Sequence, residues 1–162
     1  MEAIKADEKA TADCYTNQGT VKVSAQTITV ETRERTDLVN LSDAIRAFVE
    51  ASGVTDGYVQ VTSLHTTAGL YVNEFQEALL ADVKQVMESL VPRQTYYQHN
   101  DPEFSDCDRH NADSHLRNVV LGRSLSIPIS QGKIVLGRWQ SVILAEFDGA
   151  NQRQVFMQVF GI

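Results

Sequence analysis

Cysteine, proline and long apolar runs are all scarce in this sequence, and each shortage excludes a class of protein. The 162 residues include only 2 Cys, 3 Pro and 1 Trp. Cys14 and Cys107 form no CxxC motif and no disulfide-rich pattern, which favours a reducing compartment. No apolar stretch approaches the roughly 20 residues that span a bilayer, and the N-terminus lacks the apolar segment of a signal peptide. We therefore predict a cytoplasmic protein with no membrane partner.

Basic residues are also few. Lys and Arg number 14 against 21 Asp and Glu, which gives a formal net charge of −7. Because a net anion is repelled by nucleic-acid phosphates, no nucleic-acid partner is expected, although a local basic pocket could still hold a small phosphate. The hydrophobic fraction of 43% and the charged fraction of 22% are typical of one globular domain.

Periodicity divides the chain into a polar N-terminal extension and one domain. Residues 1–19 are predicted to be a flexible extension, and residues 20–162 form the domain. Strands are expected at residues 21–32 and 57–67, helices at 38–53, 74–90 and 115–122, and a four-stranded meander over 123–162. The apolar segments 141–147 and 153–162 favour burial on both faces, either in an oligomer or as central strands. The prediction is a single α+β domain with a mostly antiparallel sheet and two to three helices.

Four histidines are candidates for chemistry. His65 lies at the end of a predicted strand, His99 and His110 lie in the loop 92–113, and His115 opens a short helix. A long loop without periodicity is often functional. Neutral imidazole is the commonest side-chain ligand for Zn²⁺, and three such ligands with an open position make a catalytic site. The alternative is that each histidine is solvated, since no HExxH or HxH spacing supports a metal site.

The segment SLHTTAGLYVNE is dense in small polar groups. Thr66 and Thr67, with Gly69 beside them, could cradle an oxyanion. Asn73 and Glu74 fall at the expected start of a helix, where unpaired N–H groups and the dipole attract an anion. The competing interpretation is structural, with Asn73 as the N-cap and Glu74 in the first turn. Both interpretations stay open at this point.

Two further charged residues stand out. Asp113 lies two residues before His115 and is predicted to cap the short helix or to orient an imidazole. Arg153 belongs to a predicted strand end, where an arginine can hold a phosphate through two hydrogen bonds. The sequence contains no Walker loop, GxGxxG turn or GxSxG elbow, which disfavours nucleoside-triphosphate, Rossmann and serine-hydrolase chemistry.

Taken together, three groups of motifs resemble a known family. They are HTTAGLYVNE, YYQHND and the continuous run NADSHLRNVVLGRSLSIPISQGKIVLGRWQSVILAEFDGANQRQV. In this order they are similar to the YjbQ-like family, which is also described as secondary thiamine-phosphate synthases. The resemblance runs from about Thr20 to the end of the chain. It implies a small α+β fold that assembles as a homotrimer, with a pocket between subunits.

The resemblance also implies site residues and an activity. The positions that match family histidines, and so the implied metal ligands, are His65, His99 and His115. Glu74, Asn73, Asp113, Gln140 and Glu146 fall on family-typical positions, whereas His110 matches none. The implied activity is that of a weak transferase, thiamine-phosphate synthase, which joins a pyrimidine-methyl diphosphate to a thiazole phosphate and expels pyrophosphate.

The first functional hypothesis is a metal-dependent enzyme that acts on a small anionic or phosphorylated substrate. Three imidazoles suit Zn²⁺, whereas Mg²⁺ prefers oxygen ligands and would be expected only if the synthase activity is real. In this hypothesis Glu74 and His115 are catalytic, and Asp113 and Glu146 support the site. The residues predicted to position the substrate are Thr66, Thr67, Asn73, Gln140 and Arg153.

Two other hypotheses belong to different classes. One is a non-enzymatic trimeric module that binds a small anion or metabolite, in which Glu74→Gln would change affinity little. The other is a purely structural or chaperone-like trimer. The number of polar groups gathered at strand and helix ends argues against the last, because they cost stability if they are buried without a partner.

Overall fold

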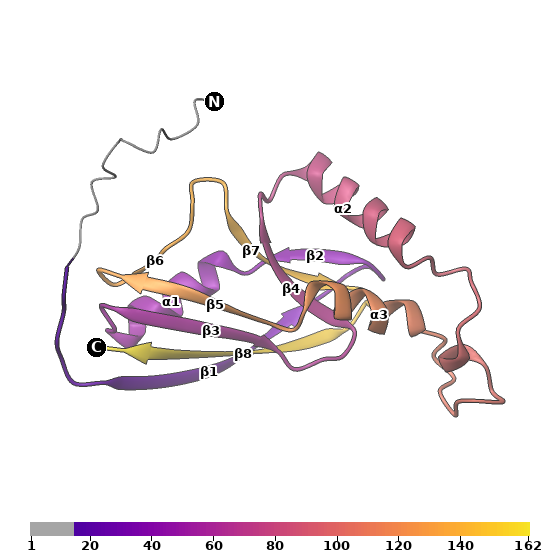
Figure 1. Cartoon of the computed structure of the whole chain (residues 1–162), viewed down its shortest axis with the longest axis horizontal. Coiled ribbons are helices and arrows are strands. Elements are labelled where there is room, and N and C mark those ends of the chain that lie inside the picture. The colour runs from indigo at the N-terminus through magenta and orange to yellow at the C-terminus, as the bar shows by residue number, and fades with distance from the viewer. Residues whose placement is uncertain (1–14) are drawn as a thin grey trace, which may run out of the picture.

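Alternating apolar side chains build a five-stranded antiparallel sheet with the strand order β1-β8-β3-β5-β6 (Figure 1). Its strands are β1 (Lys22–Glu31), β8 (Gln152–Gly161), β3 (Gly57–Ser63), β5 (Ser124–Ser130) and β6 (Lys133–Ile134). The computed structural model describes residues 15–162. Along β8, Val155, Met157 and Val159 are buried and the residues between them are not. Within the chain this strand therefore buries one face, so the expected burial of its other face would need another copy of the chain and stays a prediction.

A second sheet has three antiparallel strands in the order β2-β7-β4. They are β2 (Asp37–Asn40), β7 (Ser141–Glu146) and β4 (Ala68–Asn73). From β7, Val142 and Leu144 enter the core between the two sheets, while Ile143 and Ala145 enter a second core. The apolar run of β7 is thus explained by its central position, and its burial requires no partner chain.

Three α-helices complete the fold: α1 (Ser42–Ser52), α2 (Glu77–Leu90) and α3 (Ala112–Leu121). The buried face of α1 packs into the core between the sheets, whereas α2 and α3 contribute to the second core on the outer face of the small sheet (Figure 1). The predicted end of the first helix at Gly53 is confirmed, since this residue has φ 65° and closes the last turn. At the other end the Asn40 side chain accepts the Ser42 N–H at 2.9 Å.

The predicted α+β class, the single domain and the mostly antiparallel pairing are confirmed. The predicted meander is wrong, because β7 belongs to the small sheet while β5, β6 and β8 belong to the large one. The segment after Asp148 therefore crosses between sheets and is not a hairpin turn. Glycine is required at Gly149 because a Cβ there would overlap the backbone oxygen of Glu34.

Several element boundaries differ from prediction: α1 begins at Ser42 instead of residue 38, and β3 ends at Ser63 instead of residue 67. The two strands β2 and β4 were not predicted, and residue 112 rather than 115 begins α3. The second helix begins at Glu77, because Gln76 is its N-cap and accepts the Leu79 N–H at 2.9 Å. Asn73 instead ends β4 and accepts the N–H of Glu74 at 2.9 Å, so its interpretation as an N-cap is wrong.

The predicted extension of residues 1–19 lies mostly outside the described residues, as does Cys14. Of its described part, Tyr15 donates its hydroxyl to one carboxylate oxygen of Asp56 at 2.6 Å, and Asn17 donates to the other at 2.6 Å. In the part of the chain that the structure describes, no helix has the length and apolar character needed to cross a membrane.

Candidate functional site

A pocket of about 280 Å³ lies where the end of β3, the beginning of β8 and the N-terminal end of α3 meet. Six predicted site residues line it together with four others: His65, Thr66, Thr67, His99, His115 and Arg153, and Cys107, Arg109, Asn111 and Asp148. A more apolar hollow of about 360 Å³, lined partly by Tyr97 and Leu116, borders it and shares His99 and His115. The fold thus brings residues that are far apart in sequence to one place.

Strand pairing places His65 in the pocket. The register pairs Ser63, at the end of β3, with Val155 of β8, and the next residue, Leu64, donates its N–H to the Gln154 oxygen at 3.0 Å. The N–H of Gln154 then donates to His65 Nε2 at 2.7 Å. The imidazole therefore substitutes for a backbone carbonyl and extends the ladder by one hydrogen bond, which fixes the ring.

The guanidinium of Arg153 is held from behind by a buried carboxylate. Glu146 is fully buried, and both of its oxygens accept hydrogen bonds from Arg153, one of them at 2.7 Å from Nη2. The same Nη2 donates to Thr67 Oγ1 at 3.1 Å, and Nη1 lies 3.4 Å from His65 Nδ1. Two-point pairing fixes the plane of the guanidinium, so Glu146 positions Arg153 against the two pocket residues.

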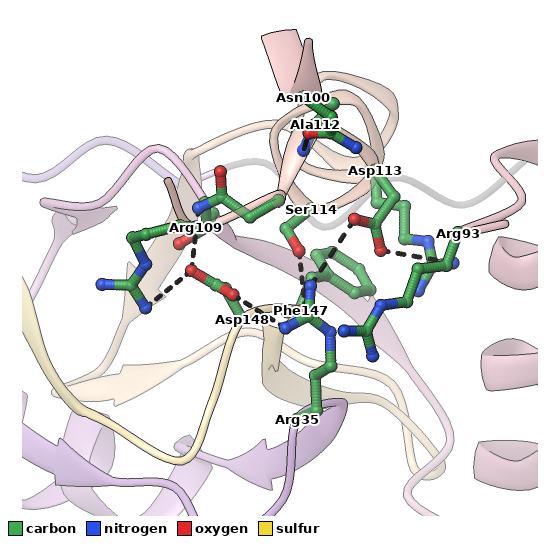
Figure 2. A network of polar contacts seen from close by, with 12 residues as sticks. Arg35, Arg93, Asn100, Arg109, Ala112, Asp113, Ser114, Phe147 and Asp148 are labelled. Atoms are coloured by element: carbon green, nitrogen blue, oxygen red, sulfur yellow. Dashed lines mark hydrogen bonds and ion pairs between the residues drawn. The ribbon is translucent and has the colours of Figure 1, made fainter. Parts of the chain in front are cut away.

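Asp148 organises the opposite wall (Figure 2). This carboxylate is 5% exposed, and it lies 3.1 Å from Arg35 Nη1 and 2.8 Å from Arg109 Nη2. It also accepts a hydrogen bond from Asn111 Nδ2 at 2.8 Å. The Arg109 side chain is 56% exposed, so this guanidinium keeps donors directed to solvent and available to a ligand.

The side chain of Asp113 is buried, which its place in the sequence did not predict. It is fully buried, and its oxygens lie 3.6 Å from Arg35 Nη2 and 3.7 Å from Arg117 Nη2 without a hydrogen bond to either (Figure 2). The predicted cap interpretation is wrong, since α3 has Asn111 as its N-cap and no side-chain cap hydrogen bond. In the structure Asp113 contributes a buried negative charge between two arginines near His115.

His99 and His115 form an edge-to-face pair with ring centroids 5.0 Å apart. His99 comes from a 3₁₀ turn (Gln98–Asn100), and His115 from the first turns of α3. Burial lowers the pKa of His115 below its usual 6.5, and the neighbouring His99 lowers it further. Burial and the Arg153 charge lower the pKa of His65 in the same way. Near neutral pH both imidazoles are therefore mainly uncharged.

Three predicted residues lie elsewhere in the single chain. The register of β4 with β7 pairs Ala68 with Glu146 at the pocket end and Asn73 with Ser141 at the other. Five residue steps of about 3.4 Å separate these ends by roughly 17 Å. Asn73, Glu74 and Gln140 thus gather at the far end of this strand pair, and Gln140 accepts the Gly137 N–H there at 2.7 Å.

Gly69 also differs from its predicted place in an oxyanion cradle. It lies within β4, and a Cβ there would approach Asn118 Oδ1 to 2.8 Å and the Gly122 oxygen to 3.0 Å. The residue is therefore needed for close packing of α3 against β4. Arg109 and Asp148 are pocket residues that the sequence did not predict. The signal that could have identified Asp148 is its place directly after the buried strand β7.

The three predicted metal ligands share the pocket, but they do not form a ready-made metal site. Within residues 15–162, no three His, Cys, Asp or Glu side chains are grouped closely enough to hold one ion as they stand. His99 and His115 are neighbours, whereas His65 faces Gln154 and Arg153 on the opposite wall.

An α+β domain of two antiparallel sheets with a pocket of imidazole and guanidinium groups defines the class of this protein. The profile of the family "UPF0047 protein YjbQ-like" matches residues 26–162. The chain belongs to this family.

Curated relatives support the same assignment. A UPF0047 protein of Methanothermobacter thermautotrophicus is 35% identical over 141 residues, which cover 87% of this chain and 94% of the relative. A UPF0047 protein of Archaeoglobus fulgidus is 36% identical over 131 residues, with coverages of 81% and 97%.

Solved structures agree with the fold. A protein of unknown function from Sulfolobus solfataricus superposes with a TM-score of 0.82 at 28% identity, covering 88% of this chain and 100% of that one. A hypothetical protein from Aeropyrum pernix gives a TM-score of 0.79 at 28% identity, with coverages of 86% and 99%. These similarities establish the family and the fold, and the family is one of unknown function.

Proposed function

We propose that the pocket is the active site of an enzyme that acts on a small anionic or phosphorylated substrate. The observation that carries this proposal is the convergence of His65, His99 and His115 with two guanidinium groups in one cavity. Its volume of about 280 Å³ is just below the range for drug-sized ligands, which favours a small substrate.

The anion-binding part of the proposal rests on Arg109 and Arg153. Arg153 is fixed by Glu146 and reaches Thr67, whereas the exposed Arg109 is anchored through Asp148. A guanidinium presents several donors in a fixed plane, which suits phosphate oxygens. The one pocket carboxylate is shared by arginines, so it does not stand free to repel an anion.

The chemical part rests on His99 and His115. An imidazole whose pKa lies below neutrality can accept a proton from a substrate hydroxyl or a water and return it to a leaving group. Burial keeps His115 uncharged and ready to accept a proton, and the ring of His99 packs edge-to-face against it and lines the same hollow. We assign His115 the role of general acid–base.

A divalent metal ion held by two of the three predicted ligands is the alternative to this acid–base role, because an imidazole that binds a metal through its lone pair cannot also accept a proton. None of the hydrogen bonds of the described residues uses the rings of His99 and His115, and such imidazoles fit Zn²⁺. His65 does not fit in this conformation, because its Nε2 lone pair accepts the Gln154 N–H. A bound ion would supply Lewis-acid polarisation of the substrate. Mg²⁺ fits this nitrogen-rich donor set less well.

Thiamine-phosphate synthase activity enters only through the family resemblance. Expulsion of pyrophosphate requires neutralisation of the leaving group, for which the pocket offers Arg109 and Arg153. We propose that this transferase reaction is a side activity with a different native substrate. A purified protein that made thiamine phosphate faster than about 1 per second, a rate typical of dedicated enzymes, would contradict this view.

The family resemblance implies a homotrimer, and we propose that this assembly brings together two groups of predicted residues that lie apart in one chain. Glu74, Asn73 and Gln140 can act at the pocket only if another copy brings them there. Exposed apolar residues on α3, such as Val119 at 79% exposure, provide a surface for assembly. If the site is shared, mixing inactive Glu74→Gln and His115→Ala proteins should restore part of the activity, since some mixed trimers contain one intact site.

The test measures release of phosphate or pyrophosphate from a panel of small phosphorylated compounds, with and without added Zn²⁺. We expect His115→Ala to lose at least about 100-fold in rate, the usual minimum for a general acid–base group. His110→Asn is the matched control, because His110 neighbours Arg109 outside the pocket and has φ 48°, a conformation that Asn tolerates.

The second candidate function is a binding protein that holds a small anion in the same pocket and does not convert it. It predicts that phosphorylated compounds bind and are not consumed, and that His115→Ala changes affinity rather than rate. Metal analysis of protein purified without chelator adds a separate readout. If His115→Ala loses bound Zn²⁺ and His110→Asn retains it, the proposal of a metal site is supported. If no sample contains Zn²⁺, the proposal of a metal site is refuted and the acid–base proposal stands.

A further inference from the structure

The hydrogen bonds around His65 determine which of its ring nitrogens carries a proton. A backbone N–H can only donate, and the N–H of Gln154 lies 2.7 Å from Nε2. Nε2 must therefore present its lone pair, because a hydrogen on it would point directly at another hydrogen. An uncharged imidazole carries one N–H, so the proton is on Nδ1. The imidazolium form is excluded by the same contact.

This assignment changes the meaning of the contact between His65 and Arg153. Nδ1 lies 3.4 Å from Nη1 of Arg153, and a guanidinium nitrogen is always a donor. Two donors then face each other, and neither serves as an acceptor for the other. Arg153 is 8% exposed, and Nη1 has no other hydrogen-bond partner among the described residues. The Nη1 donor is therefore available to a ligand in the pocket that Arg153 lines.

A third donor lies beside these two. Thr67 is 6% exposed, and its Oγ1 accepts from Nη2 of Arg153 at 3.1 Å. One lone pair is used in this way, and the hydroxyl hydrogen, which has no acceptor among the described residues, can donate to a ligand in the pocket that Thr67 lines. Glu146 neutralises the charge of Arg153 from behind, so this corner selects a ligand through directed hydrogen bonds more than through net charge.

We propose that His65 Nδ1–H, Arg153 Nη1–H and Thr67 Oγ–H form an oxyanion site for a phosphoryl group, and that His65 is a hydrogen-bond donor to the substrate instead of a metal ligand. The proposal rests on the proposed function and specifies which wall of the pocket receives the anionic end of the substrate. The opposite wall, with His99 and His115, then faces the part of the substrate that reacts.

Two substitutions at His65 separate a donor role from a ligand role. In His65→Asn the amide nitrogen occupies roughly the position of Nδ1 and can still donate to an anion, but the acceptor for Gln154 is lost. In His65→Gln the amide oxygen occupies roughly the position of Nε2 and can still accept from Gln154, but the donor at Nδ1 is lost. The probe is inorganic phosphate, titrated by calorimetry into the full chain.

We expect the phosphate affinity of His65→Asn to lie within about threefold of that of the unmodified protein. The phosphate affinity of His65→Gln should be lower by roughly tenfold or more, the usual loss for a hydrogen bond to a charged group. Long-range ¹H–¹⁵N spectra of histidine-labelled protein give an independent readout. They should show His65 protonated on Nδ1 alone, with this resonance moving on phosphate addition and unmoved by Zn²⁺.

The proposal is overturned if Nε2 carries the proton, if phosphate leaves the His65 resonance unchanged, or if His65→Gln binds phosphate better than His65→Asn. Its failure differs from failure of the proposed function. Phosphate binding with the expected variant pattern, but no turnover of any substrate, would refute the enzyme and keep the oxyanion site. Turnover that depends on His115 but not on the donor at residue 65 would support the enzyme and refute the oxyanion site.

Discussion

The buried pair between Glu146 and Arg153 gives the sharpest stability prediction. Replacing Glu146 with Leu leaves the guanidinium in a site where it is 8% exposed and has lost both oxygens that it contacted. Breaking a buried ion pair by removing one partner costs about 3–5 kcal/mol, whereas replacing both partners by apolar residues is often neutral. We therefore expect Glu146→Leu to be strongly destabilising and Glu146→Leu with Arg153→Met to recover part of the loss, since the buried Asp148 N–H still lacks the Glu146 oxygen to which it donates at 2.7 Å.

The assay is urea unfolding followed by circular dichroism. With a slope of about 2 kcal/mol per molar urea, the single variant should unfold at a midpoint lower by roughly 1.5–2.5 M. The control is the exposed pair of Asp43 and Arg46, whose nitrogen and oxygen lie 2.7 Å apart at 99% and 52% side-chain exposure. Asp43→Ala should leave the midpoint unchanged, because solvent screens such pairs.

Two results would refute this reasoning. One is a single variant at Glu146 that unfolds at the midpoint of the unmodified protein, which would mean that the guanidinium finds water when its partner is removed. The other is a double variant at least as unstable as the single one, which would mean that the pair contributes net stability of its own. In either case the rigid placement of Arg153 in the pocket would lose its physical basis.

Three further outcomes are expected. Burial lowers the pKa of His65 and His115 below 6.5 in the folded chain, so the unfolded chain binds more protons as the pH falls. The free energy of unfolding should therefore decrease below about pH 6.5 and stay level above it. Replacing both residues with Asn should flatten this pH dependence, as measured by urea titrations. Gly149→Ala should cost about 1–3 kcal/mol through overlap with backbone, whereas Gly137→Ala, which meets only a side chain, should change the unfolding midpoint little. Sedimentation should give a mass three times the chain mass of 18.0 kDa. Val119→Asp should lower the measured mass toward that of one chain without loss of secondary structure. If both proteins have the same mass, the interface lies elsewhere.

Sequence periodicity identified most elements because burial on one face leaves a local signal. The helix ending at Gly53 and the alternating strand that became β1 follow from neighbouring residues alone. The short strands β2 and β4 carry no such signal, since four or six residues fit several patterns. The sheet to which β7 belongs was also unpredictable, because a run of apolar residues reports burial and not the identity of the neighbouring strand.

The candidate site divides in the same way. The sequence by itself determined which residue types are present, and the resemblance singled out His65 and His115. Only the tertiary structure decided that Glu146 holds Arg153 from behind, that Gln154 occupies Nε2 of His65, and that Glu74 lies at the other end of its strand pair. The physical reason is that a hydrogen bond or an ion pair depends on the position of two atoms, and residues about 90 positions apart meet only after strands far apart in the chain have paired.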